Sequence, residues 1–243
     1  MKKVCLIKQP AGLGDIFFTR KIVDQVLSQG YAVIWPVISQ YEWVRHYIVR
    51  DNLVFVNEDQ QFPYKDVYTS NVINIINQDN FMYLPLMFAD RFFPDEKTML
   101  AKYRFSGISH DKWQDFLVFR RNKRKEDELF YDVLNLKDED EYILCNQEYG
   151  PPPNTKRYAI EGLPKKTKRI DISLIDGFTL FDWAKTIERA TELHIAHTSM
   201  QYFMENLNIS ANVLKSYAYG GQNQYDQVAD LFTYKKWDWV IND

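Results

Sequence analysis

Cysteine, glycine and long apolar runs are all scarce in this chain of 243 residues. Its two cysteines, Cys5 and Cys145, each lie inside an apolar run where a buried thiol is expected, which excludes a disulfide scaffold and a cysteine-rich zinc site. No apolar run approaches the ~20 residues that cross a bilayer, and Met1-Lys2-Lys3 leads into a strand-like segment rather than a signal peptide. We therefore expect a cytoplasmic protein without an integral membrane segment.

An excess of charge of one sign is also lacking. Lys and Arg number 30 and Asp and Glu number 33, which gives a formal net charge of -3. Affinity for a phosphate backbone rests on a surplus of cations, so a nucleic-acid partner is not expected. A hydrophobic share of 46% supports a buried core, and the length allows one large domain or two small ones. The oligomeric state stays open.

Strands and helices alternate at both ends of the chain. Residues 3–8 are expected to form a strand, and a glycine turn leads from it into a helix over 16–29. In the second half, a strand over 193–196 runs into a helix that starts at Thr198. This alternation predicts parallel sheets covered by helices.

A charged run over residues 137–141 separates the two alternating parts. We therefore predict an α/β protein with two Rossmann-like domains, residues 1–136 and residues 137–243, each of the usual size for a domain. Within the first domain, a further strand is expected over 72–76.

The few glycines gather where the first strand ends. Gly12-Leu13-Gly14 precedes Asp15, which opens the following helix. Such a turn leaves the first N–H groups of the helix unpaired and aimed at the crevice above the sheet, where anions and polar ligands bind. Phe17 stands where the dinucleotide-binding fingerprint has its third glycine, and no Gly-Lys-Ser/Thr follows, which disfavours NAD and excludes a P-loop. Asp15 either caps the helix or accepts a proton from a substrate.

Two further candidates follow later strands. His197-Thr198-Ser199 comes after the strand over 193–196 and opens a helix, so its hydroxyls and N–H groups either cap that helix or hold a diphosphate. Lys156-Arg157 follows the strand over 142–145 and the Pro151-Pro152-Pro153 spacer, either as solvated surface or as a pair of cations for an anion. All three candidates fall at the carboxyl ends of strands, where open α/β sheets bind ligands.

In this order, the landmarks resemble those of the heptosyltransferase-like glycosyltransferases of the GT9 type, which have the GT-B fold. The resemblance implies two Rossmann-like α/β/α domains that face each other across a cleft, with the acceptor on residues 1–136 and the nucleotide sugar on residues 137–243. It runs from about residue 3 to 220 as short motifs, and it rests on Gly12-Leu13-Gly14-Asp15, on Cys145, Glu148, Gly150 and Pro151 leading to Lys156-Arg157, on Gly177-Phe178-Thr179-Leu180, and on His197-Thr198-Ser199-Met200.

The resemblance also implies roles for particular residues. Asp15 is the general base on the acceptor side, beside the turn of Gly12, Leu13 and Gly14. The family has Asp before the Thr of its diphosphate turn and His four residues after it, whereas this chain has His197 and Tyr202, which leaves the donor sugar open. The donor diphosphate contacts Lys156, Arg157, Thr198 and Ser199. His197 leads the same turn, and it either reaches the donor phosphate or sugar or serves in capping or packing. The candidate contacts to the nucleoside or sugar are Glu148, Tyr149, Gly177, Phe178 and Tyr202, of which Tyr149 and Phe178 either stack on a nucleobase or belong to ordinary packing.

The implied reaction is direct displacement, in which the base takes a proton from an acceptor hydroxyl as that oxygen attacks the anomeric carbon. The configuration inverts, and N–H groups and cations stabilise the departing nucleoside diphosphate. Neither a metal nor a cofactor is expected: the nucleotide-diphosphate sugar is a co-substrate, and a glycan is the acceptor. Asp138-Glu139-Asp140 matches the Asp-x-Asp metal motif of other glycosyltransferases but precedes a strand in a charged run.

Two other interpretations stay open at the level of the sequence. A different nucleotide-sugar enzyme of the same fold, such as an epimerase, needs several acid and base groups around the sugar and no acceptor groove. A non-catalytic sugar-nucleotide or glycan-binding module is the alternative from another class of protein. Analysis of the reaction products separates the two enzymes.

Overall fold

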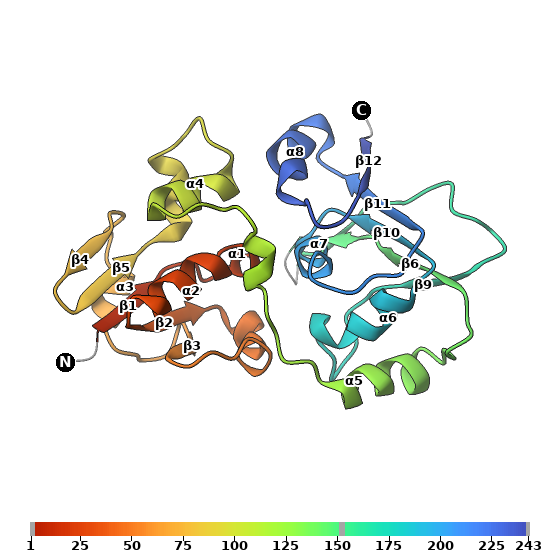
Figure 1. Ribbon diagram of the computed structural model, residues 1–243, viewed down its shortest axis with the longest axis horizontal. Helices are drawn as coiled ribbons and strands as arrows, with labels where there is room; N and C mark the ends of the chain where they lie inside the picture. Colours follow the sequence, from red (N-terminus) through yellow and green to blue (C-terminus); the bar gives the residue numbers. More distant parts are fainter. Residues whose placement is uncertain (1–2, 151–153, 242–243) are drawn as a thin grey trace. The chain divides into compact units, whose positions relative to one another are not determined.

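The computed structural model describes residues 3–150 and 154–241, and the chain forms two compact units, Met1–Arg120 and Arg121–Asp243. Each unit has a five-stranded sheet of its own with helices packed on it (Figure 1). The prediction of an α/β protein with two Rossmann-like parts is thereby confirmed. The Pro151-Pro152-Pro153 spacer lies outside the described residues. Within the described ranges, no helix has the length and apolarity that a bilayer span requires.

The N-terminal unit alternates strands with short helices. The helix expected over 16–29 is divided at Thr19, because its hydroxyl and its N–H both donate to the carbonyl oxygen of Asp15. The elements are β1 (Lys3–Ile7), α1 (Leu13–Phe18), α2 (Arg20–Ser28), β2 (Tyr31–Val37), the 3-10 helix η1 (Ser39–His46), β3 (Leu53–Asn57), α3 (Lys65–Thr69), β4 (Ile76–Gln78), β5 (Phe81–Leu84), the 3-10 helix η2 (Leu86–Arg91), α4 (Thr98–Ser106) and the 3-10 helix η3 (Trp113–Phe116).

The sheet of this unit has the strand order β3-β2-β1-β5-β4. β1 lies at its centre, parallel to β2 and β5, while the edge strand β4 is antiparallel to β5. Cys5, Leu6 and Ile7 are fully buried, as the apolar run of a central parallel strand predicts. The carboxyl end of β1 leads directly into the loop with the glycine turn.

A loop replaces the strand expected over 72–76, and β4 begins only at Ile76. Val72 reaches the core from this loop, so a short apolar run here marks packing rather than a strand. The buried cluster on which Val72 and Ile76 pack is formed by Leu6, Phe62, Tyr68 and Tyr83.

The C-terminal unit repeats the alternation, with a hairpin inserted after its first strand. Its elements are α5 (Lys123–Asp127), the π-helical turn η4 (Glu128–Val133), β6 (Tyr142–Asn146), β7 (Glu148–Tyr149), β8 (Lys156–Arg157), β9 (Lys168–Asp171), the 3-10 helix η5 (Leu180–Trp183), α6 (Ala184–Arg189), β10 (Glu192–Ala196), α7 (Ser199–Met204), β11 (Val213–Ala218), α8 (Gly221–Val228), the 3-10 helix η6 (Ala229–Leu231) and β12 (Asp238–Ile241).

The second sheet is parallel throughout its five strands, with the order β12-β11-β10-β6-β9. Asn146 at the end of β6 is level with Ile195 near the end of β10, so the loops that follow these two strands leave the same edge of the sheet. The sequence did not predict β12 or the hairpin of β7 and β8, because strands of two to four residues are too short to show a period.

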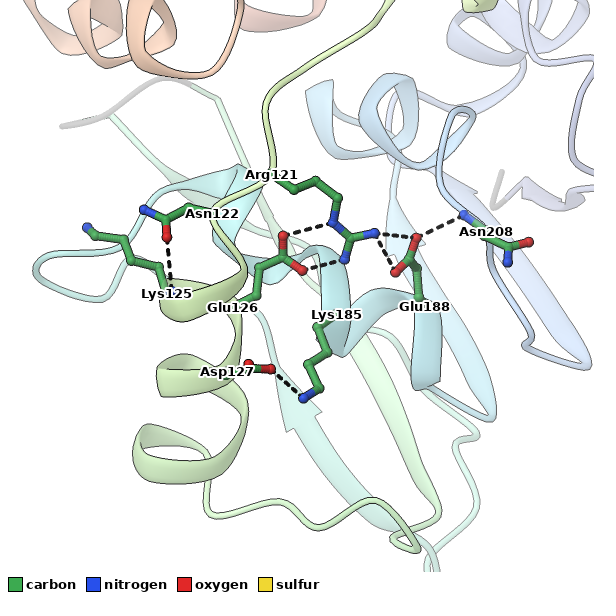
Figure 2. A network of polar contacts seen from close by, with 8 residues as sticks. All are labelled: Arg121, Asn122, Lys125, Glu126, Asp127, Lys185, Glu188 and Asn208. Carbon is green, nitrogen blue, oxygen red and sulfur yellow. Dashed lines mark hydrogen bonds and ion pairs between the residues drawn. The ribbon is translucent and has the colours of Figure 1, made fainter.

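A polar network fixes the start of the C-terminal unit (Figure 2). Arg121 bonds both carboxylate oxygens of Glu188, at 2.8 and 2.7 Å, and also bonds Glu126 of α5. A second ion pair joins α5 to α6, and the two helices pack together (Figure 2). The unit therefore begins at Arg121, ahead of the boundary expected at residue 137, because the charged helix α5 packs on α6 of this unit instead of belonging to the first domain.

Candidate functional site

The glycine turn after β1 is shaped around Asp15. Gly12 has a φ of 81°, which favours glycine, and a Cβ at this position would lie 2.1 Å from Asp15 Oδ2. Gly14 lies inside α1, and Leu13 is buried. Asp15 is in the first turn of α1, and its side chain is 27% exposed. The predicted base therefore lies at the carboxyl end of β1 and within reach of a ligand.

The carboxylate of Asp15 is paired with a lysine that the sequence did not single out. Lys102 Nζ, on α4, lies 2.7 Å from Asp15 Oδ1 and donates to Gln9 Oε1 at 2.8 Å. The Gln9 amide is fixed in turn, since its Nε2 donates to the Ala11 carbonyl oxygen at 2.7 Å. The Lys102 side chain is only 6% exposed. The sequence could have indicated this burial, because Lys102 stands between two apolar residues, Ala101 and Tyr103, that are both buried.

Tyr41 of η1 also lies close to Asp15. Burial raises the pKa of the Tyr41 phenol, a hydrogen bond with the Leu13 backbone lowers it, and the charge of Asp15 raises it further. The phenol is therefore protonated at neutral pH.

Four candidates of the C-terminal unit lie on the short hairpin. β7 and β8 pair antiparallel, with Glu148 opposite Arg157 and Tyr149 opposite Lys156. The structure thereby brings both predicted cations and the predicted glutamate around one space, which the exposed side chain of Leu174 also borders. This open hollow has a volume of about 340 Å³ and is lined by Glu148, Thr155, Lys156, Arg157, Ser173 and Leu174.

Thr198 and Ser199 start α7 at the carboxyl end of β10. The Thr198 hydroxyl accepts the Met200 N–H at 3.3 Å, which confirms that it caps the helix. Asn146, at the end of β6, donates to this hydroxyl at 3.2 Å and to the Glu148 carbonyl oxygen at 3.3 Å. Asn146 thus joins the cap of α7 to the hairpin, a role that an amide at the end of an apolar strand could have indicated.

His197 and Tyr202 lie in the core, contrary to the predicted contacts with the donor. His197 is 6% exposed and its Nδ1 lies 2.7 Å from Gln201 Oε1. Burial lowers the pKa of His197 to about 4, so the ring carries no charge at neutral pH. Both side chains pack with Phe232, and His197 also packs with Trp239. The His197 ring is held there by Gln201 of α7 and by the aromatic side chains around it, while the next residue, Thr198, caps the helix.

The remaining candidates divide between two surroundings. Tyr149 stacks on Tyr219, with ring centroids 3.9 Å apart, so one aromatic pair lies beside the hairpin. Gly177 and Phe178 lie instead in the turn before η5 and do not line the hollow. Lys125 of α5 donates to the Gly177 carbonyl oxygen and lies 5.6 Å from the centre of the Phe178 ring. That turn is therefore held by α5.

The Asp-x-Asp segment is engaged in surface contacts. Arg189 bonds Asp138 at 2.5 Å, and the hydrogen bond from the Tyr131 hydroxyl lowers the pKa of Asp138. Asp140 lies 3.6 Å from Lys168 Nζ. In the part of the chain that the structure describes, no group of three or more His, Cys, Asp or Glu side chains could hold a metal ion.

Comparison with known proteins gives similarity in structure but none in sequence. No protein-family model matches the chain, and no curated protein matches it in sequence. The chain is similar to the iron-containing dodecameric glycosyltransferase TibC from enterotoxigenic E. coli, with a TM-score of 0.49, 8% identity, and coverage of 88% of this chain and 58% of that one. It therefore spans 58% of the length of TibC.

Two further solved structures show similarity of the same degree. A glycosyl transferase family 9 protein from Veillonella parvula has a TM-score of 0.48 and 10% identity, with coverage of 89% of this chain and 81% of that one. TibC, described as a heptosyltransferase in complex with ADP-D-beta-D-heptose, has a TM-score of 0.47 and 9% identity, with coverage of 88% and 58%.

Proposed function

We propose that the protein is a glycosyltransferase that moves a sugar from a nucleotide-diphosphate sugar to a hydroxyl of a glycan acceptor. The observation that carries this proposal is the hollow beside β7 and β8, where Lys156 and Arg157 line the same space as Glu148. Two cations near the carboxyl ends of parallel strands suit a diphosphate, and a carboxylate suits sugar hydroxyls. The ordered motifs that resemble the GT9-type glycosyltransferases support the same function.

The donor diphosphate is assigned to the C-terminal unit. Lys156 and Arg157 supply positive charge, and Thr198 and Ser199 supply the first N–H groups and hydroxyls of α7. Asn146 links the two places through its bonds to Thr198 and the hairpin. As the bond to the sugar breaks, the diphosphate gains negative charge, so these groups stabilise the transition state more than the ground state. In our proposal they do this without a metal ion.

The acceptor is assigned to the N-terminal unit, with Asp15 as general base. Asp15 removes the proton of an acceptor hydroxyl while that oxygen forms a bond to the anomeric carbon of the donor sugar. The electrons of the bond between that carbon and the diphosphate oxygen leave with the nucleoside diphosphate. A single displacement of this kind inverts the configuration at the anomeric carbon.

The test begins with a thermal-shift screen of the full chain against UDP-, GDP-, ADP- and dTDP-sugars. We expect one of them to raise the melting temperature, because a ligand that binds only the folded state stabilises it by mass action. Incubation of that sugar with glycan acceptors should then release the nucleoside diphosphate and form a glycoside of inverted configuration, observed by NMR. A nucleotide sugar that is converted to its epimer would replace the proposal with the epimerase. Binding without transfer would favour a module that binds sugar nucleotides, and a flat screen would favour a module that binds glycans.

A further inference from the structure

Lys102 forms a buried ion pair that stability alone does not account for. Its ammonium lies 2.7 Å from Asp15 Oδ1, and the lysine side chain is 6% exposed. Removing a lysine from water costs several kcal/mol, and replacing a buried ion pair by apolar residues is often neutral or stabilising. Lys102 is therefore better explained by a function of the Asp15 carboxylate than by the stability of the fold. That carboxylate is partly exposed and follows the carboxyl end of β1.

The surroundings hold Lys102 in one position. Its second partner is Gln9 Oε1 at 2.8 Å, across 93 residues of sequence. Gln9 cannot turn its amide without losing the bond from its Nε2 to the Ala11 carbonyl oxygen, and its own carbonyl oxygen accepts the Trp35 indole N–H at 3.0 Å. The lysine is thus tied to the loop that carries the glycine turn, and the turn is tied to α4.

The two oxygens of Asp15 consequently have different surroundings. Oδ1 is taken by Lys102, whereas Oδ2 lies above Gly12, where a Cβ would come within 2.1 Å of it. Oδ2 therefore packs against the backbone of Gly12, in the space that any side chain at residue 12 would fill. Lys102 from α4 and Tyr41 from η1 both interact with Asp15.

We propose that Lys102 is a positioning residue for the reaction: it holds Asp15 by Oδ1, so that Oδ2 above Gly12 is the atom that takes the proton of the acceptor hydroxyl. This inference rests on the proposed function of Asp15 as general base. Lys102 acts through Asp15, the carboxylate that it contacts. Its loss should therefore lower the rate of transfer and leave nucleotide binding unchanged.

The test compares Lys102→Gln with Lys102→Arg and with a matched control, Arg104→Gln. Arg104 lies on the same helix and pairs with Glu96 at 3.4 Å, but its side chain is 62% exposed. General-base catalysis contributes about 10²–10⁴-fold, and we expect Lys102→Gln to lose about 10- to 100-fold of it in kcat. The dissociation constant for the nucleotide sugar, measured by calorimetry, should stay within about twofold. Lys102→Arg should recover part of the rate, and Arg104→Gln should keep the rate of the unchanged protein.

A double-mutant cycle separates positioning from mere support of the fold. In the Asp15→Asn background, Lys102→Gln should lower the residual rate much less than it does alone, because residues that act through one another are not additive. Equal losses in both backgrounds, or a wild-type rate in Lys102→Gln, would overturn the inference. If Lys102→Gln does not fold, Gln9→Leu removes the second anchor of the lysine, and an unchanged kcat in that variant overturns the inference as well. Failure of the unchanged protein to transfer sugar counts instead against the proposed function.

Discussion

The candidate site of the N-terminal unit is held by buried contacts between distant parts of the chain, whereas that of the C-terminal unit is formed by neighbours on a solvent-exposed hairpin. Lys102 and Gln9 are 93 residues apart and both are buried. Lys156 and Arg157 are adjacent in sequence, and both are exposed around an open hollow. A buried pair fixes the position of one carboxylate. Exposed cations are screened by water and ions, and two neighbouring cations both contribute to the binding of one anion. Single substitutions should therefore have large effects in the first unit and small ones in the second.

Asp15→Asn should give the largest effect. The amide cannot accept the proton of the acceptor hydroxyl, so we expect kcat to fall by about 10²–10⁴-fold. Nucleotide-sugar affinity, measured by calorimetry, should stay unchanged, because the proposed donor residues lie in the other unit. Asp111→Asn is the control, since Asp111 is an exposed carboxylate of the same unit that accepts a bond from Ser109. Transfer at the wild-type rate by Asp15→Asn would remove this residue from the mechanism.

His197, the buried residue of the His197-Thr198-Ser199 motif, should affect the stability of the protein rather than the binding of the donor. The pKa of His197 in the folded protein is lowered from 6.5 to about 4 by burial. The neutral His197 ring therefore makes its full contribution to the free energy of unfolding above pH 6.5. This contribution is lost as the pH falls from 6.5 toward 4, because the unfolded chain binds a proton that the folded chain excludes. The full loss is about 3 kcal/mol, and about 2 kcal/mol of it should be visible at pH 5.

Urea unfolding at pH 7 and pH 5 measures this loss. His197→Gln should lower the free energy of unfolding at both pH values but lose less of it than the unchanged protein between them. His46→Gln, at an exposed histidine of the other unit, serves as the control. Between pH 7 and pH 5 it should lose as much free energy of unfolding as the unchanged protein does. If the free energy of unfolding fell equally between pH 7 and pH 5 in the unchanged protein and in His197→Gln, the ring would be hydrated and able to reach a ligand.

Gly12→Ala tests whether the turn positions the base or only shapes the backbone. Gly12 and Gly30 both have positive φ values, 81° and 85°, so alanine at either position should cost about 1–2 kcal/mol of unfolding free energy. A Cβ at Gly12 meets Asp15 Oδ2, whereas nothing lies within 4 Å of a Cβ at Gly30. Both variants should therefore lose stability in urea, Gly12→Ala more than Gly30→Ala because its Cβ displaces the carboxylate that Lys102 holds. Gly12→Ala alone should also lose about tenfold or more in kcat, the loss that follows from displaced positioning. Equal kcat values for the two variants would contradict this.

The features that the sequence predicted correctly are those decided by a few neighbouring residues. The apolar run at Cys5, the turn at Gly12 and the helix cap at Thr198 depend on local burial, φ and hydrogen bonding. Lys102 escaped notice because its partners lie 87 or more residues away in sequence, and spacing within one helix cannot reveal them. His197 was assigned to the donor because a motif consists of neighbours in sequence, whereas its burial comes from Gln201, Phe232 and Trp239, which follow it in the chain and pack around its ring.

Lys156→Ala should have the smallest effect of these substitutions, and the effect should be on the binding of the nucleoside diphosphate. An exposed ion pair contributes about 0.2–1 kcal/mol, so the dissociation constant for the nucleoside diphosphate should rise about 1.4- to 5-fold. Lys166→Ala, at an exposed lysine that does not line the hollow, should leave it unchanged. The ratio between Lys156→Ala and the unchanged protein should shrink as salt is raised from about 0.05 to 0.5 M, because ions screen exposed charges. A loss in Lys156→Ala as large as that of Asp15→Asn, and insensitive to salt, would show that the hairpin closes over its ligand and buries the charge, which would make the two units alike in how they hold their substrates.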